Sequence, residues 1–417
     1  MKKIILTILM FATSISVFSQ CPTNDSTTMG PNGGNDVFYS LKNKVVSTVV
    51  NNNWHMAISV MRSQFPSNPS SGVAIRINSG VLGMTVSKLP NSQSVSNWRN
   101  IDTTGLYALP KLIDSDSSWY MSAFTAGYSG ANPFNFIWGN YNTSSKNIDG
   151  SNIFILKNQT NTIVKKVFIQ QLTFDTMWNI IISNIDNSDS VNLKIRKGDY
   201  PNKMFVYYNL VTDKLIDREP ILNTWDLLWT KYNTFASSSM GSGVIPVVGV
   251  LRNPNITVER NVGKKCDQVW LFNKTSVVNP KISLIGHNWK KHLGGGVFEI
   301  TDTFVYFINT NSTTYKLTFK GYVGGGSTKS KFNVYESTLS INENRISKIN
   351  IFPNPANSIV TIKSELPINK VQVLDMMGKV VFVCSSNSFD VSQLASGIYV
   401  INVQTENQTF QTKLIKE

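Results

Sequence analysis

Cysteine, histidine and acidic residues are all scarce in this sequence of 417 residues. Three cysteines cannot build a disulfide framework, so a hydrophobic core has to hold the chain together. Three histidines without a His-Glu-x-x-His pattern exclude the common zinc protease signature. Charged residues make up only 15% of the chain and hydrophobic residues 41%, which excludes a disordered, charged protein and indicates a globular one.

Long apolar runs are also absent after the first residues. The chain begins with two lysines, continues with an apolar run over residues 4–17 and reaches a small residue at Ser19, which predicts a secretory signal peptide over residues 1–19. The run is too short to span a bilayer, so no transmembrane segment is expected. Cys21 also suggests a lipoprotein, although the Gly or Ala that precedes a lipidated Cys is missing. A disulfide between Cys21 and Cys266 stays open.

The charge is unbalanced towards basic residues. Of the net charge of +14, the signal peptide carries +2 and the segment from residue 346 onwards carries +1, so the middle of the chain carries +11. Such a surplus favours acidic partners such as anionic surface glycans. The Lys and Arg residues are scattered rather than clustered, and an exported protein seldom meets nucleic acid. No nucleic-acid partner is expected.

The last segment, residues 346–417, predicts a small Ig-like β-sandwich. Short runs of alternating apolar residues are separated by turn sequences, as expected for about six half-buried strands. The alternating runs cover residues 359–362, 371–374, 380–383, 398–403 and 409–414.

This segment resembles the type A sorting domain of the type IX secretion system of the Bacteroidetes. The matching motifs are Phe352-Pro353-Asn354-Pro355-Ala356, Val373-Leu374-Asp375 with Gly378-Lys379, Leu394-Ala395-Ser396-Gly397-Ile398-Tyr399 and Lys413-Leu414-Ile415-Lys416. The resemblance implies a secreted or cell-surface protein that engages the type IX translocon and loses this module on arrival.

The middle of the chain contains a weak internal repeat, which divides it into β regions over residues 36–200 and 201–340. Phe38-Tyr39-Ser40-Leu41 precedes Trp54, and Tyr207-Tyr208-Asn209-Leu210 precedes Trp225 with nearly the same gap. Two similar hairpins follow, over residues 153–168 and 305–319. The pattern predicts an all-β protein with an internal duplication, and a Gly-rich linker from Gly324 to Asn344 is expected before the sorting module.

The second of these regions resembles the HmuY-like family. The resemblance is carried by Tyr207-Tyr208-Asn209-Leu210, Trp225 to Tyr232, Val247 to Leu251, and Ile285-Gly286-His287-Asn288-Trp289-Lys290. The family is all-β and contains exported haem-binding haemophores. The resemblance therefore implies an exported ligand-binding protein for which haem is a candidate ligand.

The candidate haem ligands are His292, Met240 and Cys266. His292 lies where the family places one axial histidine, a few residues after a Trp and before a Gly. No His or Met occupies the stretch expected to hold the second ligand, so Cys266, or Met240 in the preceding Ser-rich loop, is left to complete the iron's coordination. Lys290 and Lys291 are expected to supply cations at the rim.

No catalytic constellation is visible, so the protein is expected not to be an enzyme. A Gly-x-Ser-x-Gly elbow and a phosphate-binding P-loop are both missing. The acidic residues Asp114, Asp116, Asp217 and Glu219 are expected to be solvated turn residues. The alternative to haem binding is a structural, adhesion or glycan-binding surface protein. A narrow apolar cleft with a His at its mouth would favour haem, and an exposed aromatic platform would favour glycan.

Overall fold

The computed structural model describes residues 24–63, 69–238, 241–263, 265, 281–310, 313–337, 350–364, 367–376, 378–405 and 409–417. The predicted signal peptide, Cys21, Met240 and Cys266 lie outside these residues. The chain divides into two compact units at residue 338, and each is described by itself.

The fold is all-β, as the sequence predicts. The described residues contain one α-helix, α1 (Ser79–Leu82). Short 3-10 helices cover Pro31–Gly33, Pro69–Gly72, Val95–Asn97, Leu106–Ala108, Ala123–Thr125, Lys197–Asp199 and Leu222–Thr224. The rest of the ordered backbone forms antiparallel strands and the turns between them.

The first lobe of the large unit is a sandwich of two sheets. Its strands are β4 (Met56–Ser59), β5 (Ile75–Ile77), β6 (Thr85–Lys88), β7 (Gly139–Tyr141), β8 (Ile148–Gly150), β9 (Ile153–Lys157), β10 (Val164–Thr173), β11 (Met177–Asn184), β12 (Val191–Arg196), β13 (Phe205–Asn209) and β14 (Lys214–Ile216). One sheet has the order β12-β11-β10-β8-β7, with β9 paired to β10 and β6 to β9; the other has the order β14-β13-β4-β5. Their facing side chains, including Trp138 and Trp178, form one core.

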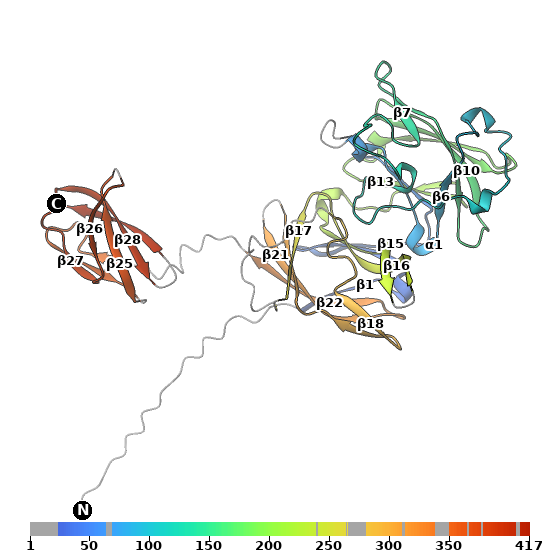
Figure 1. Ribbon diagram of the computed structural model, residues 1–417. Helices are drawn as coiled ribbons and strands as arrows, with labels where there is room; N and C mark the ends of the chain where they lie inside the picture. The colour runs from blue at the N-terminus through green and yellow to red at the C-terminus, as the bar shows by residue number, and fades with distance from the viewer. Residues whose placement is uncertain are drawn as a thin grey trace, which may run out of the picture. The chain divides into compact units, whose positions relative to one another are not determined.

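The second lobe repeats this plan (Figure 1). Its strands are β1 (Asn24–Thr28), β2 (Asn35–Ser40), β3 (Lys44–Val50), β15 (Leu227–Ser238), β16 (Gly241–Arg252), β17 (Thr257–Val262), β18 (Lys290–Gly294), β19 (Val297–Ile300), β20 (Phe304–Asn309), β21 (Thr314–Val323) and β22 (Lys329–Ser337). One sheet has the order β1-β22-β21-β20-β17, the other β16-β15-β2-β3, and β18 and β19 form a separate hairpin. Trp229, Trp289 and Tyr306 lie in its core.

The two four-stranded sheets, β14-β13-β4-β5 and β16-β15-β2-β3, are called the inner sheets because they also pack on each other. Phe38, Phe205, Trp225 and Leu228 belong to a third core between them. Strands β4 and β13, which pair at the centre of one inner sheet, are therefore covered on both faces, and every residue of β4 is buried. Burial on both faces explains why these strands read as continuous apolar runs instead of alternating ones.

Each inner sheet combines strands from both halves of the middle chain. Strand β2 pairs with β15, with Tyr39 opposite Leu227. Strand β4 pairs with β13, with Met56 opposite Tyr208. The sheet orders β3-β2-β15-β16 and β14-β13-β4-β5 become equivalent when β2, β3, β4 and β5 are matched to β13, β14, β15 and β16. The halves have thus exchanged strands.

Hydrogen bonds at the strand ends follow the same equivalence. The Nδ2 group of Asn78 donates to the carbonyl oxygens of Asn51 and Trp54, at 2.7 and 2.9 Å. The Nδ2 group of Asn253 donates to those of Leu222 and Trp225, at 2.7 and 2.8 Å. Trp54 and Trp225 are the residues that the predicted repeat aligns. The common origin of the halves stays a prediction, which these matched contacts support.

The Trp54 and Trp225 blocks contain the starts of two strands, which begin at Met56 and Leu227. The carbonyl groups of both tryptophans accept hydrogen bonds from Asn side chains. One expectation about local structure is wrong. The segment from Gly324 to Asn344 is not a linker throughout. Its residues 329–337 form β22, whose Phe332 is buried in the second lobe.

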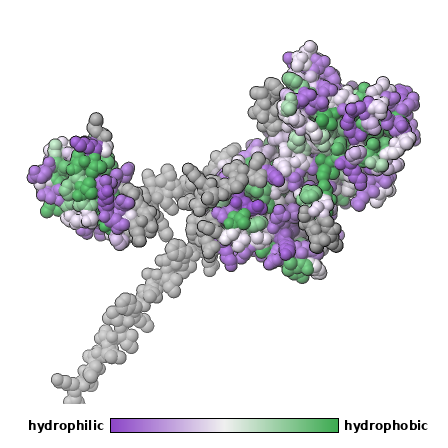
Figure 2. All heavy atoms as spheres, in the orientation of Figure 1, coloured by the Kyte–Doolittle hydropathy of each residue, from purple (hydrophilic) through white to green (hydrophobic). Residues whose placement is uncertain are grey.

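The C-terminal unit is a seven-stranded sandwich, as its alternating runs predict. Its strands are β23 (Asn350–Phe352), β24 (Ile359–Lys363), β25 (Ile368–Leu374), β26 (Val380–Cys384), β27 (Ser388–Asp390), β28 (Gly397–Thr405) and β29 (Thr409–Lys416). They form sheets of order β23-β24-β27 and β26-β25-β28-β29 around a core of their own. Cys384 is half-buried and has a free thiol. In Figure 2, hydrophobic residues gather on the visible face of this unit.

Candidate functional site

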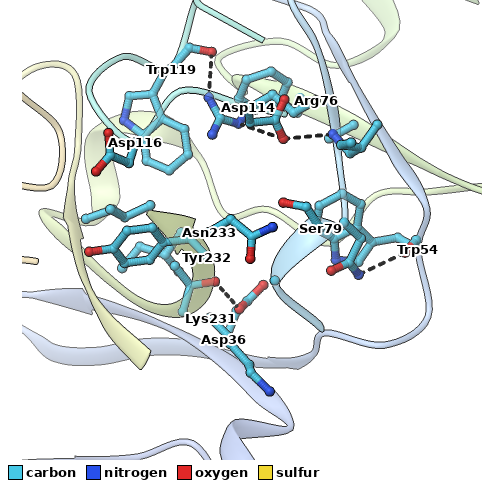
Figure 3. A pocket seen from close by; sticks show the side chains of 18 of the residues that line it. Asp36, Trp54, Arg76, Ser79, Asp114, Asp116, Trp119, Lys231, Tyr232 and Asn233 are labelled. Carbon is cyan, nitrogen blue, oxygen red and sulfur yellow. Dashed lines mark hydrogen bonds and ion pairs between the residues drawn. The ribbon is translucent and has the colours of Figure 1, made fainter. Parts of the chain in front are cut away.

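A cavity of about 70 Å³ lies between the two inner sheets. Strands from both sheets line it, together with α1 and the loop that begins at Asp114. Figure 3 shows Arg76, Asp114 and Trp119 on one side and Asp36, Lys231 and Asn233 on the other. A space of this size holds roughly five water molecules. We call it the inter-sheet cavity.

A buried ion pair forms one wall of the inter-sheet cavity. The Arg218 Nη1 group donates to Asp36 Oδ2 at 2.8 Å, and both side chains are almost fully buried. The other carboxylate oxygen accepts a hydrogen bond of 2.7 Å from the Thr230 hydroxyl. The Arg218 guanidinium also lies over the Tyr207 ring, 4.9 Å from its centroid. Removing either charge would leave the other buried and unpaired, so loss of either side chain is expected to destabilise the fold strongly.

A second arginine–aspartate pair forms the opposite wall. The Arg76 Nε group lies 3.8 Å from Asp114 Oδ2, and the guanidinium lies over the Trp119 ring at 5.3 Å. The Asp114 carboxylate also accepts hydrogen bonds of 2.9 Å from the backbone N–H groups of Ile77 and Ala123. Burial raises the pKa of Asp114, and the charge of Arg76 and the backbone bonds oppose that rise.

The floor of the inter-sheet cavity depends on a glycine. The chain of α1 passes so close to β15 that a Cβ atom on Gly80 would lie 2.2 Å from the Lys231 carbonyl oxygen. No side chain larger than a hydrogen atom fits at that position without moving backbone. Glycine here allows the helix of one lobe to contact the strand of the other and to close the cavity on that side.

Three buried polar atoms around the inter-sheet cavity have no hydrogen-bond partner in the described part of the chain. They are the donors Trp54 Nε1 and Arg218 Nε and the acceptor Asn233 Oδ1. Buried polar groups are nearly always paired, and leaving one unpaired costs roughly 1–3 kcal/mol. Two donors and an acceptor around one small space therefore indicate a polar guest with both kinds of group.

Next to the inter-sheet cavity, a buried glutamate holds the start of β13 in place. Glu219 Oε2 accepts hydrogen bonds of 2.7 and 2.9 Å from the N–H groups of Met204 and Phe205. Burial raises the pKa of Glu219 to about 7, although these two bonds and the charge of Arg218 favour the charged form. The charge of Glu219 therefore changes near neutral pH, and this change alters the hydrogen bonds that hold Phe205 in the cavity wall.

A pH-dependent stability follows from Glu219. Its pKa is raised from 4.5 in the unfolded chain to about 7 in the folded one, so the folded state binds more protons between these values. Stability contributed by the protonated group is present below pH 4.5 and falls as pH rises towards 7, by on the order of 3 kcal/mol. Glu219→Gln is expected to abolish this fall in urea unfolding at pH 5 and pH 8. Parallel profiles for wild type and variant would contradict it, and Glu299→Gln, at an exposed position, is the control.

Of the predicted haem ligands, only His292 lies in the described residues. It is exposed on the hairpin of β18 and β19, and its ring lies against Phe298 with centroids 4.9 Å apart. Met240 and Cys266 lie outside the described residues. His292 is not part of the inter-sheet cavity.

The expectation that Lys290 supplies a cation at the rim of a haem site is wrong. Its Nζ group donates 2.6 Å to the Val248 carbonyl oxygen and lies over the rings of Trp289 and Tyr322, at 4.4 and 4.6 Å. Burial lowers the pKa of Lys290 to about 7. The ammonium group is therefore directed inward, and only Lys291 of the pair is exposed.

The other two histidines have structural positions. His55 is buried, and its Nδ1 atom accepts a hydrogen bond of 3.1 Å from the Leu210 N–H group. In the equivalent place, Asp226 Oδ2 accepts from the Leu41 N–H group at 2.7 Å. Burial lowers the pKa of both His55 and His287, so both favour the neutral imidazole. In the described residues, no cluster of three or more His, Cys, Asp or Glu could hold a metal ion.

The expectation that the acidic residues are solvated is wrong for two of them. Asp114 and Glu219 are buried, because each carboxylate accepts two backbone N–H groups that would otherwise lack partners. The sequence around Asp114 and Glu219 is typical of turns. The backbone N–H groups that their carboxylates bind belong to residues 9 to 37 positions away in the chain. Arg218, which directly precedes Glu219, is the sequence signal that could have indicated a buried acid there. For Asp114 the partner is Arg76, which lies close to it only in the folded protein.

Comparison with known families confirms the predicted sorting module. Residues 350–417 match the family described as the secretion system C-terminal sorting domain. The match covers strands β23 to β29, the whole described C-terminal unit. The protein is therefore exported through the type IX system to the cell surface or beyond, and the secretion machinery is one of its partners.

One curated relative is similar over a short stretch. The ulvan lyase NLR42 of Nonlabens ulvanivorans is 31% identical over 94 residues, which is 21% of this chain and 18% of that protein. The chain thus spans about a fifth of the length of the relative it matches. No described helix is long and apolar enough to cross a membrane.

Proposed function

We propose that this exported protein binds extracellular glycans and that the inter-sheet cavity receives hydroxyl groups at one end of the glycan. The observation that carries the proposal is the set of unpartnered atoms Trp54 Nε1, Arg218 Nε and Asn233 Oδ1 around one small space. A sugar hydroxyl both donates and accepts a hydrogen bond, so adjacent hydroxyls satisfy such a mixed set.

The remaining lining supports the same class of ligand. The rings of Trp54, Trp119, Tyr207 and Tyr232 contribute aromatic surface, which packs against the C–H groups of a sugar ring. Burial raises the pKa of Tyr207 and of Tyr232 far above the usual value, so both phenols stay protonated and can donate. The charged groups of the walls are mostly engaged with each other, which favours hydroxyl groups over a free ion as the guest.

The proposal is one of binding without turnover. Asp36 and Asp114 are each paired with an arginine and accept further hydrogen bonds, which fixes them as wall elements instead of leaving a free acid and base. Prolonged incubation with the bound oligosaccharide should leave its length unchanged in chromatography. Shortened products that disappear in Asp114→Asn would establish an enzyme in place of a binding protein.

Trp54→Phe tests the inter-sheet cavity directly, because it removes one unpartnered donor and keeps an aromatic ring beside Tyr207. The affinity of the secreted protein for its best oligosaccharide is expected to fall about three- to tenfold in titration calorimetry. Trp229→Phe is the matched control: its Nε1 atom is also unpartnered, yet its ring lies in the core of the second lobe. Equal loss in both variants would remove the cavity from the proposal.

Haem remains the alternative ligand and rests on His292 among the described residues. Its support is the exposed imidazole beside Phe298 and the exposed apolar side chains Leu293 and Val297 of the same hairpin. A Soret shift on adding haemin that is lost in His292→Ala, with no oligosaccharide bound, would establish haem binding and overturn the glycan proposal. The HmuY-like resemblance likewise stays a prediction.

A further inference from the structure

A second pocket, of about 270 Å³, opens on the first lobe beside the turn between β10 and β11. We call it the aromatic pocket. Four aromatic rings line it: Phe134, Phe136, Tyr141 and Phe174. It is separate from the inter-sheet cavity, since the two share no lining residue.

Two of these rings are displayed to solvent. Phe174 is 60% exposed and Phe134 is 44% exposed. Phe134 stacks on Tyr141, with ring centroids 5.7 Å apart and planes inclined by 16°. Solvent-exposed aromatic rings that gather around one hollow mark a binding surface more often than scattered ones do.

The backbone that presents Phe174 is strained. Phe174 and Asp175 form the tight turn between β10 and β11 with φ angles of 48° and 52°. Such turns favour Asn-Gly, and an aromatic residue is uncommon at a positive φ. A residue that adopts this conformation at a cost, with its ring exposed, indicates a function for the ring.

Contacts from distant segments hold this turn in place. Asn147 Oδ1 accepts a hydrogen bond of 3.1 Å from the Phe174 N–H group. Asp175 Oδ2 accepts one of 2.6 Å from the N–H group of Ser63, and its other oxygen pairs with the buried Lys197. The Phe174 ring is thus positioned in advance, which lowers the entropy that a ligand would lose on binding.

The rim of the aromatic pocket has one free cation. Lys146 is exposed, and no carboxylate pairs with it in the described part of the chain. The carboxylate of Asp175, which also lines the pocket, forms an ion pair with Lys197. The pocket therefore presents a positive charge beside aromatic rings. It lies in the part of the chain that carries the surplus of +11.

We propose that the aromatic pocket binds a sugar ring that carries a carboxylate or sulfate group. The Phe174 and Phe134 rings pack against the C–H face of the sugar, and Lys146 pairs with its anionic group. The inference rests on the proposed glycan binding and adds a second subsite to it, one that selects acidic chains.

The test compares an oligogalacturonic acid tetramer with a neutral galactose tetramer, using the full secreted protein in titration calorimetry. Phe174→Asn removes the ring and places a residue that tolerates a positive φ. It is expected to weaken binding of the acidic tetramer about tenfold while the protein becomes no less stable. Lys146→Asn is expected to abolish the preference for the acidic tetramer and to reduce the effect of added salt.

The control and the contrary outcomes separate the two subsites. Tyr107→Asn, which removes another exposed ring outside the pocket, should leave both affinities unchanged. Unchanged acidic binding in Phe174→Asn together with weaker binding in Trp54→Phe would overturn the second subsite and leave the proposed function intact. Failure of the wild-type protein to bind either tetramer would overturn both.

Discussion

Deletion of residues 349–417 is expected to trap the protein in the periplasm. The sorting domain lies wholly within this segment, while the predicted signal peptide carries the chain only across the inner membrane. The deleted segment forms a compact unit with a core of its own, so its removal leaves both lobes of the large unit complete. Cell fractionation and protease treatment of intact cells would measure the location.

The full-length protein is the control for this deletion, and a periplasmic marker checks that the outer membrane is intact. Protease cleavage of the truncated protein on intact cells would contradict the prediction. A thermal melt of the truncated protein recovered from the periplasm should match that of the large unit in the full-length chain. That comparison separates a sorting defect from misfolding.

Trp225→Ala is expected to cost roughly 3–5 kcal/mol of folding free energy. The Trp225 ring is only 1% exposed and meets the Phe38 ring edge to face, with centroids 5.1 Å apart. It lies in the core between the inner sheets, so its loss opens a void that both lobes share. Urea unfolding would measure the change. Trp98→Ala, at a half-buried position, should cost less, and a melting temperature within a degree or two of wild type for Trp225→Ala would contradict the assignment of this core.

The sequence allowed the locally determined parts of the fold to be predicted. Both hairpins, β9–β10 and β20–β21, occur where alternating residues flank an Asn-rich turn. The strands of the C-terminal unit also follow their alternating runs. In these elements, the residues that pair lie close together in the chain, so period and turn chemistry suffice.

The inter-sheet cavity could not be predicted in the same way. Its two arginine–aspartate pairs join residues 182 and 38 positions apart, and their carboxylates lie in segments that read as solvated turns or as an ordinary strand start. What identifies them is burial, which depends on the packing of one inner sheet on the other. The Tyr-Tyr and Trp motifs indicate which strands of the two halves are equivalent, but they do not predict that β2 pairs with β15 and β13 with β4.

This exchange sets when the protein can fold. The Thr230 hydroxyl bonds to Asp36 across 194 residues of chain, and the inner sheet β16-β15-β2-β3 is not complete until β15 and β16 have emerged. Contacts of such sequence separation make folding slow, because a long loop must close before they form. We expect the second lobe, which needs these late strands, to stay unfolded while the predicted signal peptide carries the chain across the inner membrane. The strand exchange that joins the lobes would then also delay folding until this translocation step is over.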